Sequence, residues 1–170
     1  MQMSGSMEIA ADRATVWAAL LDADVLKECV PGCQEMAGNP DDGFEATVVQ
    51  KVGPVKATFK GAVQLLDRVP PESLRLEGEG KGGAAGFAKG GAAVSLHDSD
   101  GGTRLDYVVE AKVGGKLAQL GSRIIDGFAR KMADQFFERF RTAVEGPQEE
   151  IETANGEAPK KGWFKSLVSG

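Results

Sequence analysis

The sequence has few of the side chains that most often carry chemistry. One histidine and two cysteines are present in 170 residues, and the cysteines, Cys29 and Cys33, are separated by three residues. Zinc cages draw their ligands from cysteine and histidine, so this chain has too few for a closed site. We therefore expect no metal, and two reduced thiols rather than a structural disulfide.

Long apolar runs and an excess of basic residues are also lacking. Lys and Arg number 20 against 25 Asp and Glu, which gives a net charge of −5, and no basic stripe alternates with aromatics. This disfavours nucleic-acid binding. No apolar run reaches the roughly 20 residues that span a bilayer, and the first residues do not resemble a signal peptide. The sequence predicts a cytoplasmic protein that can still touch a membrane surface.

Two sequence patterns suggest catalysis or cofactor binding, but the secondary structure predicted around them does not fit either role. Gly78, Gly80 and Gly83 satisfy G-x-G-x-x-G, but a strand is expected after them, whereas a dinucleotide site needs a helix there. His97 has serine and aspartate neighbours, yet adjacent strand residues point to opposite faces and cannot assemble a triad. No carboxylate falls on a predicted apolar face, where its pKa would be raised. We expect no catalytic residue and a non-enzymatic protein.

Glycine is abundant, and its distribution is informative. Seven of the 23 glycines lie between Gly78 and Gly91, inside a segment that otherwise alternates like β-strands. Glycine weakens a strand because it has no side chain to pack and loses more backbone entropy on folding. A sheet with so many glycines either bends sharply or leaves space where a core would be. Both interpretations stay open from the sequence.

The order of the predicted elements indicates an α+β fold. A strand over residues 3–9 precedes two short helices, one after Asp12 and one over residues 23–29. About six alternating segments follow, and after Gly114 the apolar period changes from two to 3.6. Residues 117–144 then predict an amphipathic helix of about 28 residues, roughly 40 Å long. Such a helix needs a wide cover, so we expect a curved antiparallel sheet of about seven strands wrapped around it.

The inward-facing positions of this predicted fold are candidates for a ligand site. Tyr107 is the inward residue with a polar tip, and it can donate a hydrogen bond to a ligand carbonyl. Phe87 lies near the glycine-rich turn and is expected to close an entrance. The alternative is that these side chains simply pack against each other. The predicted ligand-binding residues are Val48, Phe59, Val63, Leu76, Gly78, Gly80, Phe87, Val94, Tyr107, Val109, Leu120, Gly121, Ile124 and Phe128.

The last 25 residues divide by charge. Residues 146–158 are acidic and almost without apolar side chains, as in a flexible linker after a domain of residues 1–145. Residues 159–170 are basic and amphipathic, which favours reversible contact with anionic lipid. An unstructured end, or a helix that docks on a partner, is the alternative. The predicted membrane-contact residues are Lys161, Trp163, Phe164, Lys165, Leu167 and Val168.

Several motifs resemble one known family. The turn Val30-Pro31-Gly32-Cys33, the glycine-rich strands, Leu105-Asp106-Tyr107 and above all the segment GGKLAQLGSRII at residues 114–125 are similar to the G subunit family of carbon monoxide dehydrogenase, within the START/Bet v 1-like (SRPBCC) superfamily. The resemblance covers about residues 1–145. It implies a helix-grip fold with a hydrophobic cavity between sheet and helix, and no catalytic residues.

The resemblance also implies a role. Members are associated with molybdenum-containing CO dehydrogenases and related hydroxylases, which they recruit to the inner membrane, and they bind a lipophilic quinone that takes up electrons. For this chain we expect a non-covalently bound ubiquinone or menaquinone, a molybdenum hydroxylase as partner, and a peripheral location on the inner face of the membrane. Two alternatives remain: an assembly or maturation factor for that enzyme, and a cyclase or hydrolase of the same superfamily.

Overall fold

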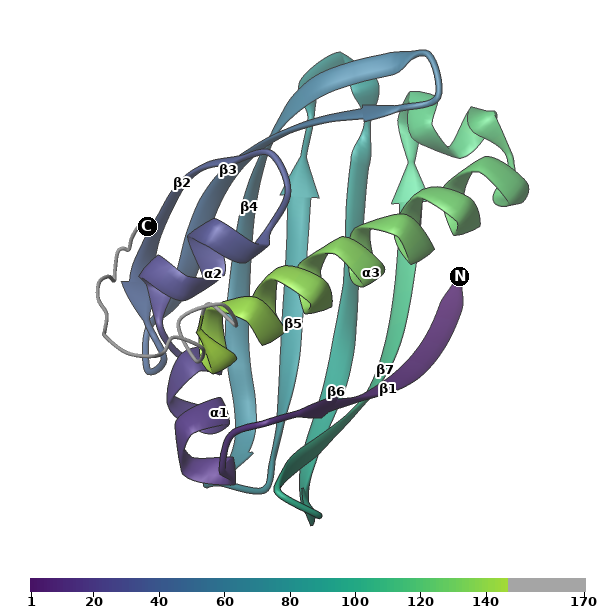
Figure 1. Cartoon of the computed structure of the whole chain (residues 1–170). Coiled ribbons are helices and arrows are strands. Elements are labelled where there is room, and N and C mark those ends of the chain that lie inside the picture. The colour runs from purple at the N-terminus through teal and green to yellow at the C-terminus, as the bar shows by residue number, and fades with distance from the viewer. Residues whose placement is uncertain (147–170) are drawn as a thin grey trace, which may run out of the picture.

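The structure, a computed structural model, describes residues 1–146. Seven strands and three α-helices make up this part of the chain, joined at two points by short 3₁₀ helices (Figure 1). The elements are β1 (Gln2–Ile9), α1 (Arg13–Leu20), α2 (Ala23–Cys29), β2 (Cys33–Asn39), β3 (Gly43–Val52), β4 (Val55–Val69), β5 (Ser73–Lys81), η1 (Gly83–Ala85), β6 (Phe87–Ser99), β7 (Gly102–Gly114), η2 (Gly115–Leu120) and α3 (Ser122–Glu145).

The strands form one antiparallel sheet in the order β1-β7-β6-β5-β4-β3-β2. Strands β2 to β7 are neighbours in sequence order. Strand β1 pairs with β7 and forms one edge of the sheet, and β2 forms the other edge. Helix α3 crosses one face of the sheet diagonally, and α1 and α2 lie beside its C-terminal half (Figure 1). The predicted α+β helix-grip architecture, with seven strands and two short helices after the first, is confirmed.

Local chemistry explains where the helices begin. The Asp12 carboxylate accepts a hydrogen bond from the Thr15 amide at 2.9 Å and caps α1. Asp22 caps α2 in the same way, with the Asp24 amide at 2.8 Å. Such caps satisfy amide groups that the first helical turn leaves without partners.

The predicted continuous helix over residues 117–144 is wrong at its start. Residues 115–120 form the 3₁₀ helix η2, and α3 begins only at Ser122. Gly121 lies between them with φ +91° and ψ 157°, a conformation that residues with a side chain rarely adopt. The apolar spacing of Leu117 and Leu120 fits either kind of turn, so periodicity alone could not reveal the break.

The closed part of the core lies at the end of the molecule that holds α1 and α2. Val16, Cys29, Leu105 and Phe140 have no exposed surface there. The rings of Phe136 and Phe140 stack with centroids 6.0 Å apart. The remaining members of this buried cluster are Ile9, Trp17, Phe44, Leu65, Leu74, Val94, Leu96 and Tyr107.

Candidate functional site

The strand registers place most of the predicted ligand-binding residues on the concave face of the sheet, which is the face toward α3. Val48 pairs with Phe59, Val63 with Gly78, and Val94 with Tyr107. Paired residues point to the same side of a sheet. Leu76 and Val109 join them, since both pair with Ala92 of β6.

Around Gly61 and Gly80, this face is not in contact with α3. A β-carbon built on Gly80 would meet only the Phe59 β-carbon at 3.9 Å and the Lys60 carbonyl at 4.0 Å. At Gly61, which pairs with Gly80, the nearest atoms belong to the backbone of β5. No atom of α3 comes within this range of either glycine. A β-carbon on Gly61 would lie 3.2 Å from the Glu79 carbonyl oxygen, so Gly80 is the position of this pair with room for a side chain.

Two other glycines on the same face allow adjacent strands of the sheet to pack closely. A β-carbon on Gly78 would lie 2.9 Å from the Ala62 carbonyl oxygen, and one on Gly90 would overlap the carbonyl of Glu110. Gly78 and Gly90 are paired partners on β5 and β6. They allow adjacent strands to approach more closely than residues with side chains permit, as expected where a sheet bends.

The helix side of this half is apolar and only partly covered. Ile124 of α3 is 40% exposed although it lies on the apolar stripe, and Leu120 and Phe128 are half-buried. Leu120 and Ile124 lie over the β3–β4 turn, where a β-carbon on Gly53 would be 3.9 and 3.6 Å from them. The structure thus brings the predicted helix residues to the same half as Gly61 and Gly80. Gly121 lies at the η2–α3 junction beside them.

Tyr107 lies at the boundary between the open half and the closed core. It is 6% exposed, and its ring stacks on Phe137 with centroids 4.5 Å apart. Its hydroxyl accepts a hydrogen bond from the Arg130 guanidinium at 3.1 Å, and Arg130 also donates to the Ser4 carbonyl at 3.3 Å. A side chain on Gly5 would overlap the Tyr107 hydroxyl. Gly5 therefore makes room for this tyrosine between β1 and α3.

Phe87 is not brought together with the other predicted residues. It pairs with Lys81 and Gly114, which belong to the outer, convex face, and it is 42% exposed. Its neighbour Ala88 takes the inward position instead. Alternation along β6 is regular, but the sequence alone did not establish which residue of the pair faces α3.

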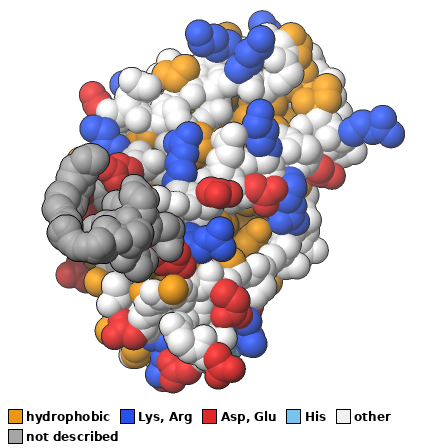
Figure 2. All heavy atoms as spheres, viewed as in Figure 1, with side chains coloured by type: hydrophobic (Ala, Val, Ile, Leu, Met, Phe, Trp, Pro, Cys, Tyr) orange, Lys and Arg blue, Asp and Glu red, His pale blue; other side chains and the backbone are white. Residues whose placement is uncertain are grey.

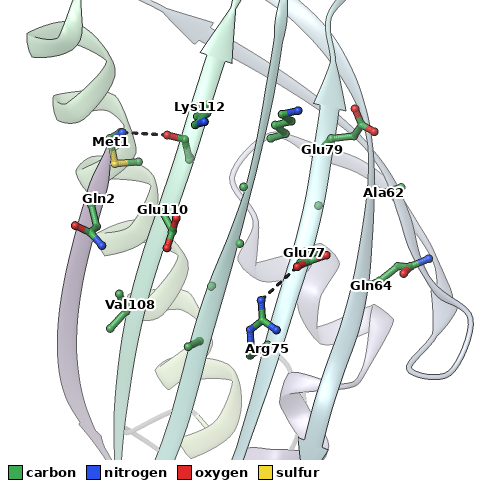
Figure 3. Close-up of a pocket in the computed structure, with 17 residues that line it drawn as sticks. Met1, Gln2, Ala62, Gln64, Arg75, Glu77, Glu79, Val108, Glu110 and Lys112 are labelled. Carbon is green, nitrogen blue, oxygen red and sulfur yellow. Dashed lines mark hydrogen bonds and ion pairs between the residues drawn. The ribbon is translucent and has the colours of Figure 1, made fainter.

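A second hollow lies on the convex face, over the small side chains of β6 (Figure 3). This groove encloses about 930 Å³. Arg75 and Glu77 form one wall, with an ion pair of 3.3 Å between them, and Glu110 and Lys112 form the opposite wall. Charged walls of both signs make the groove unsuitable for a lipophilic molecule, which requires an apolar lining.

The titratable groups give little support for catalysis. Burial raises the pKa of Cys29 to about 11, and it also raises the pKa of Cys33, so both free thiols are protonated near neutrality. The hydrogen bond from Ser6 lowers the pKa of Asp106, which lies on the convex face. His97 contacts Asp106 at 3.2 Å on the same face. Residues 1–146 contain no group of three potential metal ligands.

With this geometry in view, comparison with known proteins is decisive for the family. Residues 5–145 match the family described as the G subunit of carbon monoxide dehydrogenase (CoxG). The chain belongs to the CoxG family. CoxG proteins are accessory subunits. A search of curated proteins finds no match.

Solved structures agree with the CoxG assignment at the level of the fold. A conserved protein from Geobacillus kaustophilus is 28% identical, with a TM-score of 0.78 over 85% of this chain and 95% of that one. Protein CV1439 from Chromobacterium violaceum is 17% identical, with a TM-score of 0.62 over 86% of this chain and 98% of that one. A protein from Rhizobium leguminosarum is 14% identical, with a TM-score of 0.67 over 85% and 94%.

Sequence analysis missed Arg130 and Gly5, which fix the position of Tyr107. Arginine is mostly exposed in proteins, so nothing in the sequence marked Arg130 as the partner of a buried tyrosine. The signal for Gly5 was a single glycine inside a predicted strand, which marks a close approach. The predicted tail contacts, Lys161, Trp163, Phe164, Lys165, Leu167 and Val168, lie outside the described residues. Within the described part, no helix is long and apolar enough to cross a bilayer.

Proposed function

We propose that this CoxG protein holds a lipophilic quinone, ubiquinone or menaquinone, between its sheet and α3. In this role it carries the quinone between the membrane and a molybdenum-containing CO dehydrogenase-type hydroxylase, which passes its electrons to the quinone. The protein itself does no chemistry. The observation that carries the proposal is the apolar part of the concave face around Gly80, where no atom of α3 lies within 4 Å of the β-carbon position.

The walls of this space suit an isoprenoid chain. Val63, Leu76 and Val109 from the sheet and Phe128 from α3 are apolar but only half-buried. Covering apolar surface releases roughly 25 cal/mol per Å², so a chain inserted there gains affinity without polar contacts. In this half of the face, within residues 1–146, no carboxylate or histidine occupies an inward strand position. This favours a carrier over a cyclase or hydrolase.

Tyr107 is suited to orient the head group. Its oxygen accepts from Arg130, while its own hydrogen has no acceptor among the described residues. A quinone carbonyl offers that acceptor. Because Arg130 withdraws charge from the phenol oxygen, the tyrosine becomes a better donor. The predicted tail, residues 159–170, would supply reversible contact with the lipid surface in this scheme.

The test compares two substitutions on neighbouring strands. Gly80→Leu places a side chain in the space above the concave face, and we expect it to fold but to lose quinone binding at least tenfold. Ala62→Leu, on β4, also introduces a leucine, with one carbon fewer added, on the opposite face of the sheet and serves as the control. The measurements are mass spectrometry of solvent extracts from the purified full chain and the rise in Tm with short-chain ubiquinone or menaquinone in detergent.

The outcomes separate the hypotheses. Recovery of quinone from the parent and Ala62→Leu, but not from Gly80→Leu, supports the proposal. If the parent yields no quinone and shows no rise in Tm with either probe, the carrier role is wrong. An assembly or maturation factor for the same hydroxylase then becomes the better explanation.

A further inference from the structure

Positive charge is concentrated at one end of the molecule although the chain is acidic overall. Across the convex face, Lys60 is paired directly with Lys81, and Lys89 with Lys112. Lys51 and Lys56 face each other at the β3–β4 turn. Like charges directly opposite each other destabilise a sheet. Such pairs therefore need a reason other than stability.

These basic side chains have no ion-pair partner among the residues that the structure describes. We call this surface the basic end; it comprises Lys51, Lys56, Lys60, Lys81, Lys89, Lys112, Lys116 and Arg123, all of them exposed. None of them forms an ion pair within residues 1–146. The acids in the same rows of the sheet are Glu35, Glu45 and Glu79, and Glu79 is directly opposite Lys89. The positive charge of the basic end is thus available to a binding partner.

The opposite end of the molecule carries mainly acidic side chains. Its hairpins carry Asp41 and Asp42, Asp98 and Asp100, and Glu72. Its arginines are neutralised: Arg13 contacts Asp98 at 2.9 Å, and Arg68 contacts Asp41 at 2.7 Å. Figure 2 shows Lys and Arg side chains along the upper edge of the molecule and mainly Asp and Glu at the lower end. The charges are therefore segregated along the long direction of the strands.

An exposed aromatic ring lies among the lysines. Phe87 is 42% exposed and is paired with Lys81 on one side and Gly114 on the other. Its ring lies over Gly114, where a β-carbon would overlap it. The inward row next to it is Gly61, Gly80 and Ala88, part of the unpacked half of the concave face. The basic end, the exposed ring and the open half thus occupy the same end of the molecule.

We propose that the basic end docks on an anionic lipid bilayer, with Phe87 inserted at the interface. Lysine clusters next to an exposed apolar side chain are typical of surfaces that bind acidic phospholipids. This inference rests on the proposed function, in which a lipid-soluble quinone moves between bilayer and protein, and it adds the surface that meets the bilayer. Docking in this orientation places the open half near the lipid, on the opposite face of the same strands.

Sedimentation of the full chain with vesicles tests the surface. The vesicles are phosphatidylcholine alone or with 30% phosphatidylglycerol. We expect binding to the anionic vesicles alone, and at least a tenfold loss of binding in Lys60→Glu/Lys81→Glu. The control Lys27→Glu/Lys131→Glu changes the net charge by the same amount on exposed lysines of α2 and α3 and is expected to keep its binding. Phe87→Ser should weaken binding without changing the charge.

The variants are checked for folding by their thermal transitions and for quinone binding in detergent. The proposal is overturned if both double variants lose the same amount of vesicle binding. It is also overturned if Lys60→Glu/Lys81→Glu binds anionic vesicles as well as the parent does. If that variant keeps its lipid binding but no longer binds the hydroxylase, the basic end is a protein-docking surface instead. A protein that binds anionic vesicles but takes up no quinone contradicts the proposed function and leaves this docking surface in place.

Discussion

At the scale of single residues, the glycines of the concave face serve two different purposes. Gly78 and Gly90 are surrounded so closely by neighbouring strands that a β-carbon would collide with backbone atoms. A β-carbon on Gly80 would make only ordinary contacts, at 3.9 and 4.0 Å. The composition of the segment cannot distinguish these cases, because a glycine that allows close packing of strands and a glycine that leaves room for a ligand look the same in the sequence. Only the positions of the neighbouring carbonyls show which glycine shapes the sheet and which leaves room for a ligand.

Asp106 provides a residue-scale prediction about pH. Its carboxylate accepts a hydrogen bond from the Ser6 hydroxyl at 2.6 Å and contacts Arg104 at 3.3 Å. The Ser6 hydrogen bond is the main cause of its lowered pKa. A carboxyl whose pKa is lower in the folded state stabilises the fold above its unfolded pKa, near 3.8, and this contribution is lost as the pH falls through the folded pKa.

Asp106→Asn is therefore expected to reduce the free energy of unfolding at pH 7 by about 0.2–1 kcal/mol, the range for exposed charged pairs. The difference from the parent should disappear near pH 2. Urea unfolding at a series of pH values measures this. Ser6→Ala should remove most of the same pH-dependent contribution, and adding it to Asp106→Asn should cost little more. A difference that persists unchanged at pH 2 would show that the carboxylate charge plays no part.

At the scale of elements, the junction between η2 and α3 depends on one backbone conformation. Gly121 has φ +91° and ψ 157°, and no atom lies within 4 Å of the place where its β-carbon would be. A substitution there meets no steric barrier from neighbours, only backbone strain. Gly127, by contrast, lies within α3 and also has no atom near its β-carbon position.

The two glycines should respond to alanine in opposite directions. Gly121→Ala is expected to destabilise the protein by about 1–3 kcal/mol because alanine tolerates that conformation poorly. Gly127→Ala should stabilise it by about 0.5–1 kcal/mol, since glycine is a poor helix former. Chemical denaturation of both variants provides the comparison. Stabilisation by Gly121→Ala would mean that α3 continues through the junction as one helix.

At the scale of the whole molecule, alternation and period were enough to predict the fold. The change from period two to 3.6 after Gly114 identified the sheet and the helix, and the pattern of β7 identified its inward residues. What the sequence could not provide was contact between distant elements. The hydrogen bond from Arg130 to Tyr107 joins α3 to β7, and the outward position of Phe87 depends on which face of β6 meets the helix.

The division of the concave face into a closed and an open half predicts unequal stability. Leu105 lies in the closed half with no exposed surface, whereas Ile124 lies over the open half and is 40% exposed. Leu105→Ala is expected to cost about 2–5 kcal/mol, because it leaves a cavity in packed surroundings. Ile124→Ala should cost less than about 1 kcal/mol, because the side chain is only partly covered.

Urea unfolding measures the loss in the free energy of unfolding for Leu105→Ala and Ile124→Ala, which remove side chains of equal volume. Quinone binding should show the opposite order, with the larger loss in Ile124→Ala, since that side chain faces the proposed ligand. Equal destabilisation by the two substitutions would mean that α3 packs as tightly over the glycine half as over the closed core. In that case the space on which the carrier role depends would not exist in solution.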